Sequence, residues 1–184
     1  EGQGGLWLHD VARGTRTRMI FDTTNVTHPT WIGDGSRYAY SVNANGNAST
    51  TFVRATDGTT AAIRLVEGFG VSSSLAADEI VFSRFNAGTI LDLYRRSFDA
   101  SDSGAVFVKT PRIEQGAVLS PDGRLVAYMS DISGANEIYV RRFPSGEGLW
   151  QVSLDGGVWP RWARDGSYLL FRRRSGGQAE MVRV

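Results

Sequence analysis

The sequence predicts an all-β fold of the β-propeller class, with about four four-stranded antiparallel blades. Two observations carry this prediction: several sequence registers repeat every 42 to 45 residues, and each repeat reads as four short strands. The clearest register is an Asp-Gly pair, which begins at Asp34, Asp122 and Asp165, 88 and 43 residues apart. Asp78 lies 44 residues after the first of these, although Glu79 follows it where glycine is expected.

Large apolar residues keep the same period. Three residues before each aspartate stands a residue that we expect in the core of a blade: Trp31, Leu75, Leu119 and Trp162. Two further registers consist of Trp7, Phe52, Tyr94, Tyr139 and Met181, and of Phe21, Leu65, Phe107 and Trp150. Four registers with one period indicate a true internal repeat.

Each period is expected to contain four strands, named A to D from the propeller axis outward. Segments such as 124–130 and 137–143 mix alternating polarity with aromatic and β-branched residues, as strands do. The Asp-Gly pairs between such segments are strong signals for tight turns. No window sustains the 3.6-residue apolar period of a helix. Four strands in about 44 residues are typical of a propeller blade.

The strand count predicts how the 184 residues are divided. Residues 1–21 are expected to supply strands C and D of a partial blade, followed by blades at 22–66, 67–110 and 111–154. Residues 155–184 are expected to supply strands A, B and C of another partial blade. The two partial blades both claim a strand C. We therefore expect a part of a larger propeller, or a ring completed by association between copies.

Two stretches carry a resemblance to known families. The segment from Leu119 to Asp131, Leu-Ser-Pro-Asp-Gly-Arg-Leu-Val-Ala-Tyr-Met-Ser-Asp, followed by 137–143, resembles the repeat of TolB-like propellers. The continuation through 150–153 and 156–166 is similar to the propeller that bacterial receptor-like serine/threonine kinases carry at their C-terminus. The resemblance implies a sensor or scaffold domain and favours a periplasmic or other extracytoplasmic location.

Composition and motifs exclude several kinds of chemistry. The chain has no cysteine and a net charge of +1, so neither thiol chemistry nor nucleic-acid binding is expected. No apolar run approaches the roughly 20 residues that span a bilayer, so we expect no membrane insertion of this segment. The hydrolase elbow and the phosphate-binding loop are absent. Residues 99–110 begin like a calcium loop, but Thr110 stands where a bidentate carboxylate is needed. No cofactor, metal or catalytic group is expected.

Binding is therefore expected on loops. In a propeller the D-to-A and B-to-C loops open on one face, here 22–27, 67–71, 111–115 and 154–158, with 43–48, 85–90, 131–136 and 175–178. These loops differ between repeats while the Asp-Gly turns recur, as binding loops on a rigid scaffold do. The candidate binding residues on or beside them are Asn25, His28, Asn43, Asn45, Phe69, Glu114, Asp131, Asn136 and Trp159.

Three functions remain open at this stage. The first is a non-catalytic module of a bacterial protein that binds a protein or a small ligand. The second is the gating propeller of a prolyl-oligopeptidase-type peptidase whose hydrolase domain lies elsewhere, so that the parent protein would be an enzyme. The third is a self-associating structural repeat without a ligand. The expected partner is another protein or a second copy of the chain.

Overall fold

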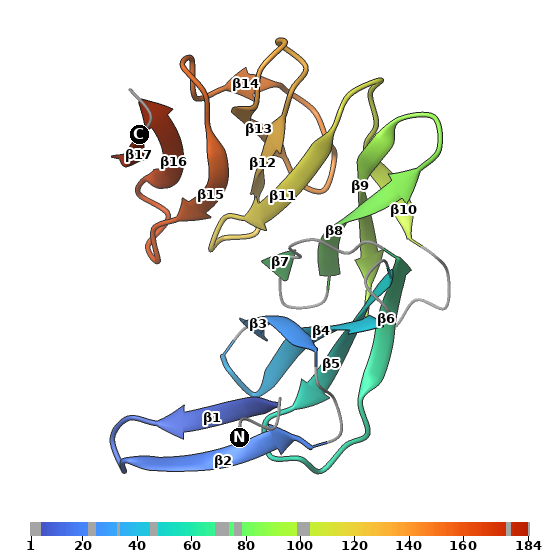
Figure 1. Ribbon diagram of the computed structural model, residues 1–184, viewed down its shortest axis with the longest axis vertical. Coiled ribbons are helices and arrows are strands. Elements are labelled where there is room, and N and C mark those ends of the chain that lie inside the picture. The colour runs from blue at the N-terminus through green and yellow to red at the C-terminus, as the bar shows by residue number, and fades with distance from the viewer. Residues whose placement is uncertain are drawn as a thin grey trace. The chain divides into compact units, whose positions relative to one another are not determined.

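A computed structural model describes residues 5–21, 25–32, 34–44, 48–68, 74–75, 79–98, 104–175 and 178–183. All regular secondary structure in these ranges is β-strand, arranged in antiparallel sheets (Figure 1). The predicted all-β fold with four-stranded antiparallel sheets is thereby confirmed. The chain forms two compact units, Glu1–Gly70 and Val71–Val184, called unit 1 and unit 2 below and described separately.

Unit 1 contains a two-stranded and a four-stranded sheet. The first pairs β1 with β2, and the second has the order β3-β4-β5-β6. The strands are β1 (Leu6–Asp10), β2 (Thr15–Ile20), β3 (Val26–Ile32), β4 (Arg37–Ala44), β5 (Ala48–Ala55) and β6 (Ile63–Gly68). β6 therefore runs two residues past position 66, where the sequence placed the end of this blade.

Unit 2 contains two four-stranded sheets and one three-stranded sheet, in the orders β7-β8-β9-β10, β11-β12-β13-β14 and β15-β16-β17. Their strands are β7 (Ser74–Leu75), β8 (Glu79–Asn86), β9 (Ile90–Ser97), β10 (Ala105–Val108), β11 (Glu114–Leu119), β12 (Leu125–Ser130), β13 (Glu137–Arg142), β14 (Trp150–Gln151), β15 (Val158–Trp162), β16 (Leu169–Ser175) and β17 (Gln178–Arg183). In each sheet the strands follow one another in chain order, as in a propeller blade.

The Asp-Gly pairs form the tight turns between the first and second strands of the sheets. In the turn between β11 and β12, the Asp122 carboxylate accepts hydrogen bonds from the Ser120 hydroxyl at 2.6 Å and from the Arg124 N–H at 3.1 Å. These bonds hold the pKa of Asp122 below its usual value. The Asp165 carboxylate likewise accepts from the N–H two residues on, that of Ser167, and its hydroxyl donor is the same Ser167. The Asp-Gly repeat in the sequence thus corresponds to a repeated tight turn that an aspartate carboxylate stabilises by hydrogen bonds.

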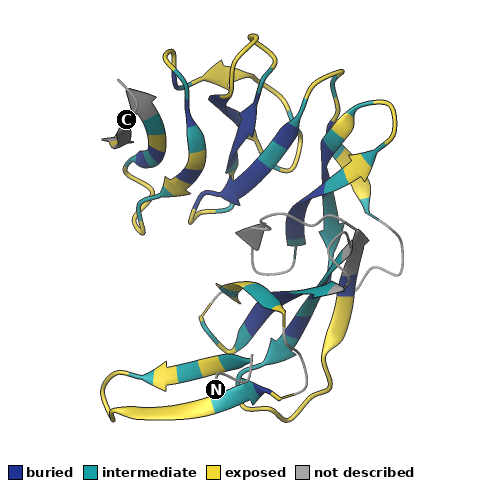
Figure 2. Ribbon diagram, in the orientation of Figure 1, coloured by how far each residue is buried: buried dark blue, intermediate teal, exposed yellow. Residues whose placement is uncertain are grey.

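The core of unit 2 lies between neighbouring sheets (Figure 2). One layer joins β12 and β13 to β16 and includes the fully buried Ala127 and Ile138 and the nearly buried Phe171. The Trp162 indole N–H crosses this layer and donates to the Val118 carbonyl at 3.1 Å. The core role expected for Trp162 agrees with this contact. Its counterpart Trp31 in unit 1 is 54% exposed, so the same expectation for Trp31 was wrong.

Candidate functional site

Four connections of unit 2 end on the same edge of its sheets (Figure 1). They join β8 to β9, β10 to β11, β12 to β13 and β14 to β15. Antiparallel pairing brings these connections to one edge and sends the Asp-Gly turns to the other. We call residues 85–90, 109–113, 131–136 and 152–157 the loop face.

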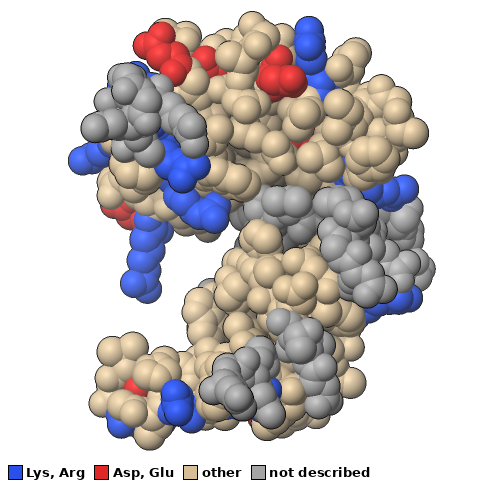
Figure 3. Space-filling view, in the orientation of Figure 1, with Lys and Arg blue, Asp and Glu red and all other residues tan. Residues whose placement is uncertain are grey.

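Large apolar side chains project from the loop face. The exposed fractions are 56% for Phe85, 53% for Ile90, 41% for Ile132 and 80% for Leu154. Ile90 has a φ of 76°, which a β-branched residue seldom adopts. Acidic side chains also show along this edge in Figure 3, and Asp131 and Asp155 belong to its loops. The face therefore offers apolar contact area next to hydrogen-bond acceptors.

A buried carboxylate fastens the first of these loops. Asp92 is fully buried near the start of β9, and its Oδ2 accepts hydrogen bonds from the Asn86 amide and from the Thr89 hydroxyl at 2.7 Å. The Lys109 ammonium lies 3.8 Å from the same oxygen and supplies a compensating charge. These contacts fix the turn that carries Phe85 and Ile90.

A second buried carboxylate fastens the loop before β11. Glu114 is fully buried and accepts hydrogen bonds from the N–H and hydroxyl of Thr110 and from the Ser130 hydroxyl. Burial raises the pKa of Glu114 above its usual value. Nearby, the Asp131 carboxylate accepts from the Ile113 N–H at 2.9 Å. Glu114 was predicted as a contact residue, but a fully buried side chain cannot touch a partner. It holds a loop instead.

A third buried carboxylate fastens the loop before β15. Glu137 is 3% exposed and accepts hydrogen bonds from the Ser153 hydroxyl and, at 2.8 Å, from the Gly156 N–H. The Asn136 carbonyl accepts from the Gly157 N–H at 2.8 Å. A Cβ at Gly157 would lie 2.5 Å from the Ser153 hydroxyl oxygen, so any other residue there would have to displace the Ser153 side chain. The loop that carries Leu154 is thus held closely against β13.

The first strands of three sheets share a β-bulge. The pairing register shifts between Thr27 and Thr30 in β3, between Gln115 and Val118 in β11, and between Val158 and Arg161 in β15.

One residue in each bulge has a positive φ: 52° for His28, 70° for Gly116 and 57° for Trp159. His28 and Trp159 each precede a proline, a position that disfavours such values. Strain of this kind is often found at functional sites. His28 is exposed and Trp159 is 41% exposed, so both side chains are accessible.

The structure distributes the predicted site residues over both units. In unit 1 the Asn25 carbonyl accepts from the Asn43 N–H at 3.0 Å, so Asn25, just before β3, pairs with Asn43 in β4. Asn45 and Phe69 lie outside the described residues. In unit 2, Asp131 and Asn136 belong to the loop face, and Trp159 lies in β15 just beyond it.

The exposed apolar residues of the loop face were missed by sequence reasoning. Phe85, Ile90, Ile132 and Leu154 all fall within loops that the sequence identified, but none of the four is among the predicted contact residues. An apolar residue inside a segment of turn residues was the available signal, because such a side chain has no core to enter.

Two further features of the described ranges concern metal binding and membrane insertion. No group of three or more His, Asp or Glu side chains there is arranged to hold a metal ion. No helix within the same ranges is long and apolar enough to cross a membrane.

Comparison with known proteins defines the fold. No protein-family model matches the chain, and no curated protein sequence matches it either. Among solved structures, TolB from Acinetobacter baumannii superposes with a TM-score of 0.74 at 16% identity, over 97% of this chain and 45% of TolB. A TolB candidate from Agrobacterium tumefaciens gives 0.74 at 18% identity, over 98% of this chain and 74% of that one.

A third similar structure is an enzyme. A puromycin hydrolase superposes with a TM-score of 0.73 at 16% identity, over 94% of this chain and 29% of the hydrolase. The chain thus spans less than a third of that enzyme and under half of the A. baumannii TolB. Together these likenesses place the fold in the β-propeller class, and within it the fold is TolB-like.

Proposed function

We propose that this propeller module is non-catalytic and binds a protein partner through the loop face of unit 2. The observation that supports this most is the set of four exposed apolar side chains, Phe85, Ile90, Ile132 and Leu154. Buried carboxylates hold in place the connections that carry Phe85, Ile90 and Leu154. Loops that are already ordered lose little conformational entropy on binding. A rigid face with apolar tips and acidic neighbours fits another protein surface.

The chemistry of the face favours contact over catalysis. Asp92, Glu114 and Glu137 each hold a loop, and the four exposed apolar side chains among these loops offer neither a nucleophile nor a general base. The alternative of a gating propeller is based on the likeness to the puromycin hydrolase, which is a likeness of fold alone. This likeness does not favour it over a binding module. A bacterial source and an extracytoplasmic location belong to the proposal too, because they follow from the family resemblance of the repeat.

The size of the apolar set indicates a reversible interaction. Burying one large apolar side chain contributes about 1.5–3 kcal/mol, so four contribute roughly 6–12 kcal/mol before costs. Association itself costs about 4–15 kcal/mol. The four exposed apolar side chains alone therefore give weak binding. Hydrogen bonds to Asp131 and Asp155 at the same edge are needed for higher affinity. We expect an exchanging complex.

Site-specific crosslinking tests the proposal. A photoreactive amino acid is introduced at Ile132, at Leu154 or, as control, at Ser167 in a turn on the opposite edge. We expect the two loop-face probes to capture the same protein and the control probe not to capture it. Excess unlabelled chain should compete, and a chain with all four apolar tips changed to serine should not. Equal capture by the Ser167 probe, or equal competition by the serine variant, contradicts the proposal.

A further inference from the structure

Glu114 links two loops of the loop face. Its carboxylate is fully buried at the start of β11 and accepts hydrogen bonds from the N–H and the hydroxyl of Thr110, in the loop 109–113. It also accepts from the hydroxyl of Ser130 at 3.3 Å, where β12 ends before the loop 131–136. The two hydroxyl groups donate to the same oxygen atom, Oε1. One buried carboxylate therefore joins two loops that are distant in the sequence.

Each of these hydroxyl groups is also an acceptor. The Thr110 hydroxyl oxygen accepts from the Arg112 N–H at 3.2 Å, and the Ser130 hydroxyl oxygen accepts from the Ile132 N–H at 3.2 Å. A hydroxyl group has one proton, and in both cases that proton is directed to Glu114. Two chains of hydrogen bonds thus run from the loop backbone to the same carboxylate. They hold Ile132, one of the four exposed apolar side chains of the loop face, and the exposed Arg112.

This arrangement requires an ionised carboxylate. An ionised carboxylate only accepts hydrogen bonds, whereas a neutral carboxyl group carries an O–H that donates. If Oε1 takes the proton, one of the two hydroxyl protons that point at it must turn away, and if Oε2 takes it, the Thr110 N–H is opposed. In either case one donor loses its acceptor. The remaining bonds lose the charge that makes such bonds roughly twice as strong.

The pKa of Glu114 reflects two opposing influences. Burial raises it and the hydrogen bonds from Thr110 and Ser130 lower it, and the result is a pKa above the usual value of 4.5. Because these bonds favour the ionised form, protonation must weaken them by the same free energy. The ionised form thus makes all three bonds although burial of its charge is unfavourable.

The charged groups beside Glu114 have partners of their own. On β9, the negative charge of Asp92 adds to the rise in the pKa of Glu114, and Lys109 lies 3.8 Å from the Asp92 carboxylate. In the loop after β12, the Asp131 carboxylate accepts from the Ile113 N–H at 2.9 Å. Lys109 therefore compensates the charge of Asp92 rather than that of Glu114.

On β12 and β13 the charge of Glu114 acts on a pair of residues, Tyr128 and Arg141. Burial raises the pKa of Tyr128, and the charge of Glu114 adds to this rise. The Arg141 guanidinium donates to the Tyr128 hydroxyl at 3.0 Å and to the Gly146 carbonyl at 2.8 Å. Tyr128 therefore keeps its proton throughout the acid range.

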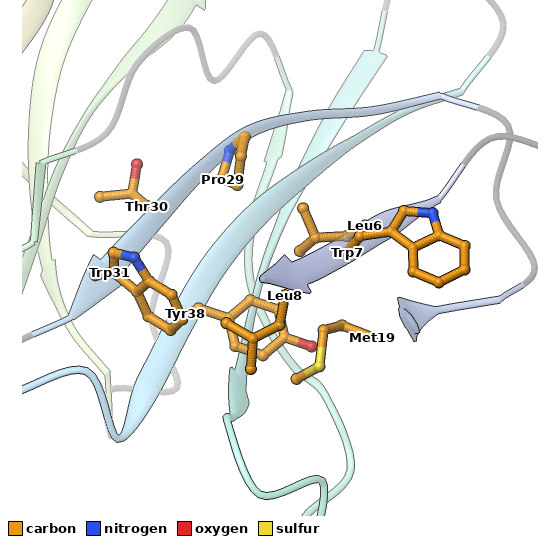
Figure 4. A pocket seen from close by; sticks show the side chains of 8 residues that line it. All are labelled: Leu6, Trp7, Leu8, Met19, Pro29, Thr30, Trp31 and Tyr38. Carbon is orange, nitrogen blue, oxygen red and sulfur yellow. The ribbon is translucent and has the colours of Figure 1, made fainter. Parts of the chain in front are cut away.

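The apolar pocket of unit 1 provides a contrast. It lies between β1–β2 and β3–β4, has a volume of about 210 Å³, and is lined by side chains such as Leu8, Met19 and Trp31 (Figure 4). Of the side chains shown in Figure 4, only the Tyr38 phenol is ionisable, and burial raises its pKa above 10. Acid is therefore expected to act on the carboxylates of unit 2 and to leave this pocket unchanged.

We propose that protonation of Glu114 switches the loop face between a fastened and a released state. The ionised carboxylate fastens the backbone at Arg112 and Ile132, and the neutral carboxyl group releases it as the pH falls. Binding of a protein partner weakens together with this release, a step that rests on the proposed function of the loop face. The change in the loops themselves does not depend on that function.

An NMR titration of backbone amides tests the switch without any partner. The N–H signals of Arg112 and Ile132 in the full chain are followed as the pH is lowered, with the Arg124 N–H as an internal control. The Arg124 N–H donates to the Asp122 carboxylate, whose pKa the Ser120 hydroxyl holds below its usual value of 3.8. We expect Arg112 and Ile132 to titrate together with a midpoint above pH 4.5, and Arg124 with a midpoint below pH 3.8.

Glu114→Gln keeps the size of the side chain and cannot ionise. In this variant the response of Arg112 and Ile132 above pH 4.5 should disappear, while the response of Arg124 remains. A response of Arg112 and Ile132 that persists in Glu114→Gln would overturn the proposal, and so would a midpoint that they share with Arg124 in the unchanged chain.

Two further variants interrupt one chain of hydrogen bonds each. Ser130→Ala should abolish the response of Ile132 and keep that of Arg112, and Thr110→Val should do the reverse. These two variants decide the question if Glu114→Gln does not fold. An unchanged response of Ile132 in Ser130→Ala would contradict the proposal.

Crosslinking through the probe at Leu154 tests the effect on binding. Capture should fall more steeply with falling pH in the unchanged chain than in Glu114→Gln, and equal slopes would refute the coupling to binding. Capture without an amide response contradicts the switch alone. An amide response without capture at any pH contradicts the proposed function alone.

Discussion

Removal of the Ser153 hydroxyl should loosen the loop face and destabilise unit 2. Ser153 is 3% exposed, and its hydroxyl oxygen accepts from the Ile138 N–H at 2.8 Å while its proton goes to the Glu137 carboxylate. In Ser153→Ala the Ile138 N–H is buried without a partner, which costs about 1–3 kcal/mol, and a charge-assisted bond worth about 1.5–3 kcal/mol is lost. The sum is about 2.5–6 kcal/mol before any relaxation.

Thermal melting and amide exchange measure this effect. The melting temperature should fall by about 5 °C or more, since each 1 kcal/mol shifts it by at least about 2 °C in a chain of this size. Exchange at Gly156 and Gly157 should accelerate, because their N–H bonds belong to the same fastened loop.

The matched control is Ser133→Ala, where an exposed hydroxyl makes a 3.5 Å contact with the Ala135 carbonyl, and the change should stay within about 0.5 kcal/mol. Equal melting of the Ser153 and Ser133 variants would refute the reasoning.

Three further predictions follow from single contacts. Glu114 has a pKa raised above 4.5, so the folded state holds its proton longer and stability falls as pH rises from about 4.5 through the raised pKa. In urea unfolding, the stability of Glu114→Gln should fall less over this rise in pH than the stability of the unchanged chain does. Parallel pH profiles of the two proteins would contradict this. Trp162→Phe should cost about 0.5–1.5 kcal/mol more than Trp31→Phe in urea unfolding, because only Trp162 bonds a carbonyl. Trp159→Gly should be more stable than Trp159→Ala by about 1 kcal/mol in the same assay, since φ is 57° there, and the reverse order would argue against strain.

The repeat made the fold predictable because turns and core residues recur with it. Asp122 and Asp165 each accept a hydrogen bond from the backbone N–H two residues on, and the register aromatics Tyr94 and Tyr139 each pack against an aromatic ring of the neighbouring strand. Turns and strand periodicity depend on residues that are close in the sequence, so a single sequence is enough to predict them.

The candidate site was less predictable because it depends on contacts between residues distant in sequence. A glutamate at position 114 reads as a surface residue until Thr110 and Ser130 are seen to satisfy its carboxylate in the interior. Trp31 has the same sequence context as Trp162, yet it is half exposed because no described strand covers it. The burial of a residue depends on which segments pack against it in space, and the period of the sequence does not specify those segments.

The bulge in the first strand of the sheets has a consequence for how specificity can change. One backbone geometry accepts histidine at position 28, glycine at position 116 and tryptophan at position 159. The bulge therefore forms with an imidazole, with an indole or with no side chain at this position. Substitutions at these positions are expected to change an accessible side chain while the strand pairing of the blade is kept, which makes them natural places to diversify a library of engineered variants.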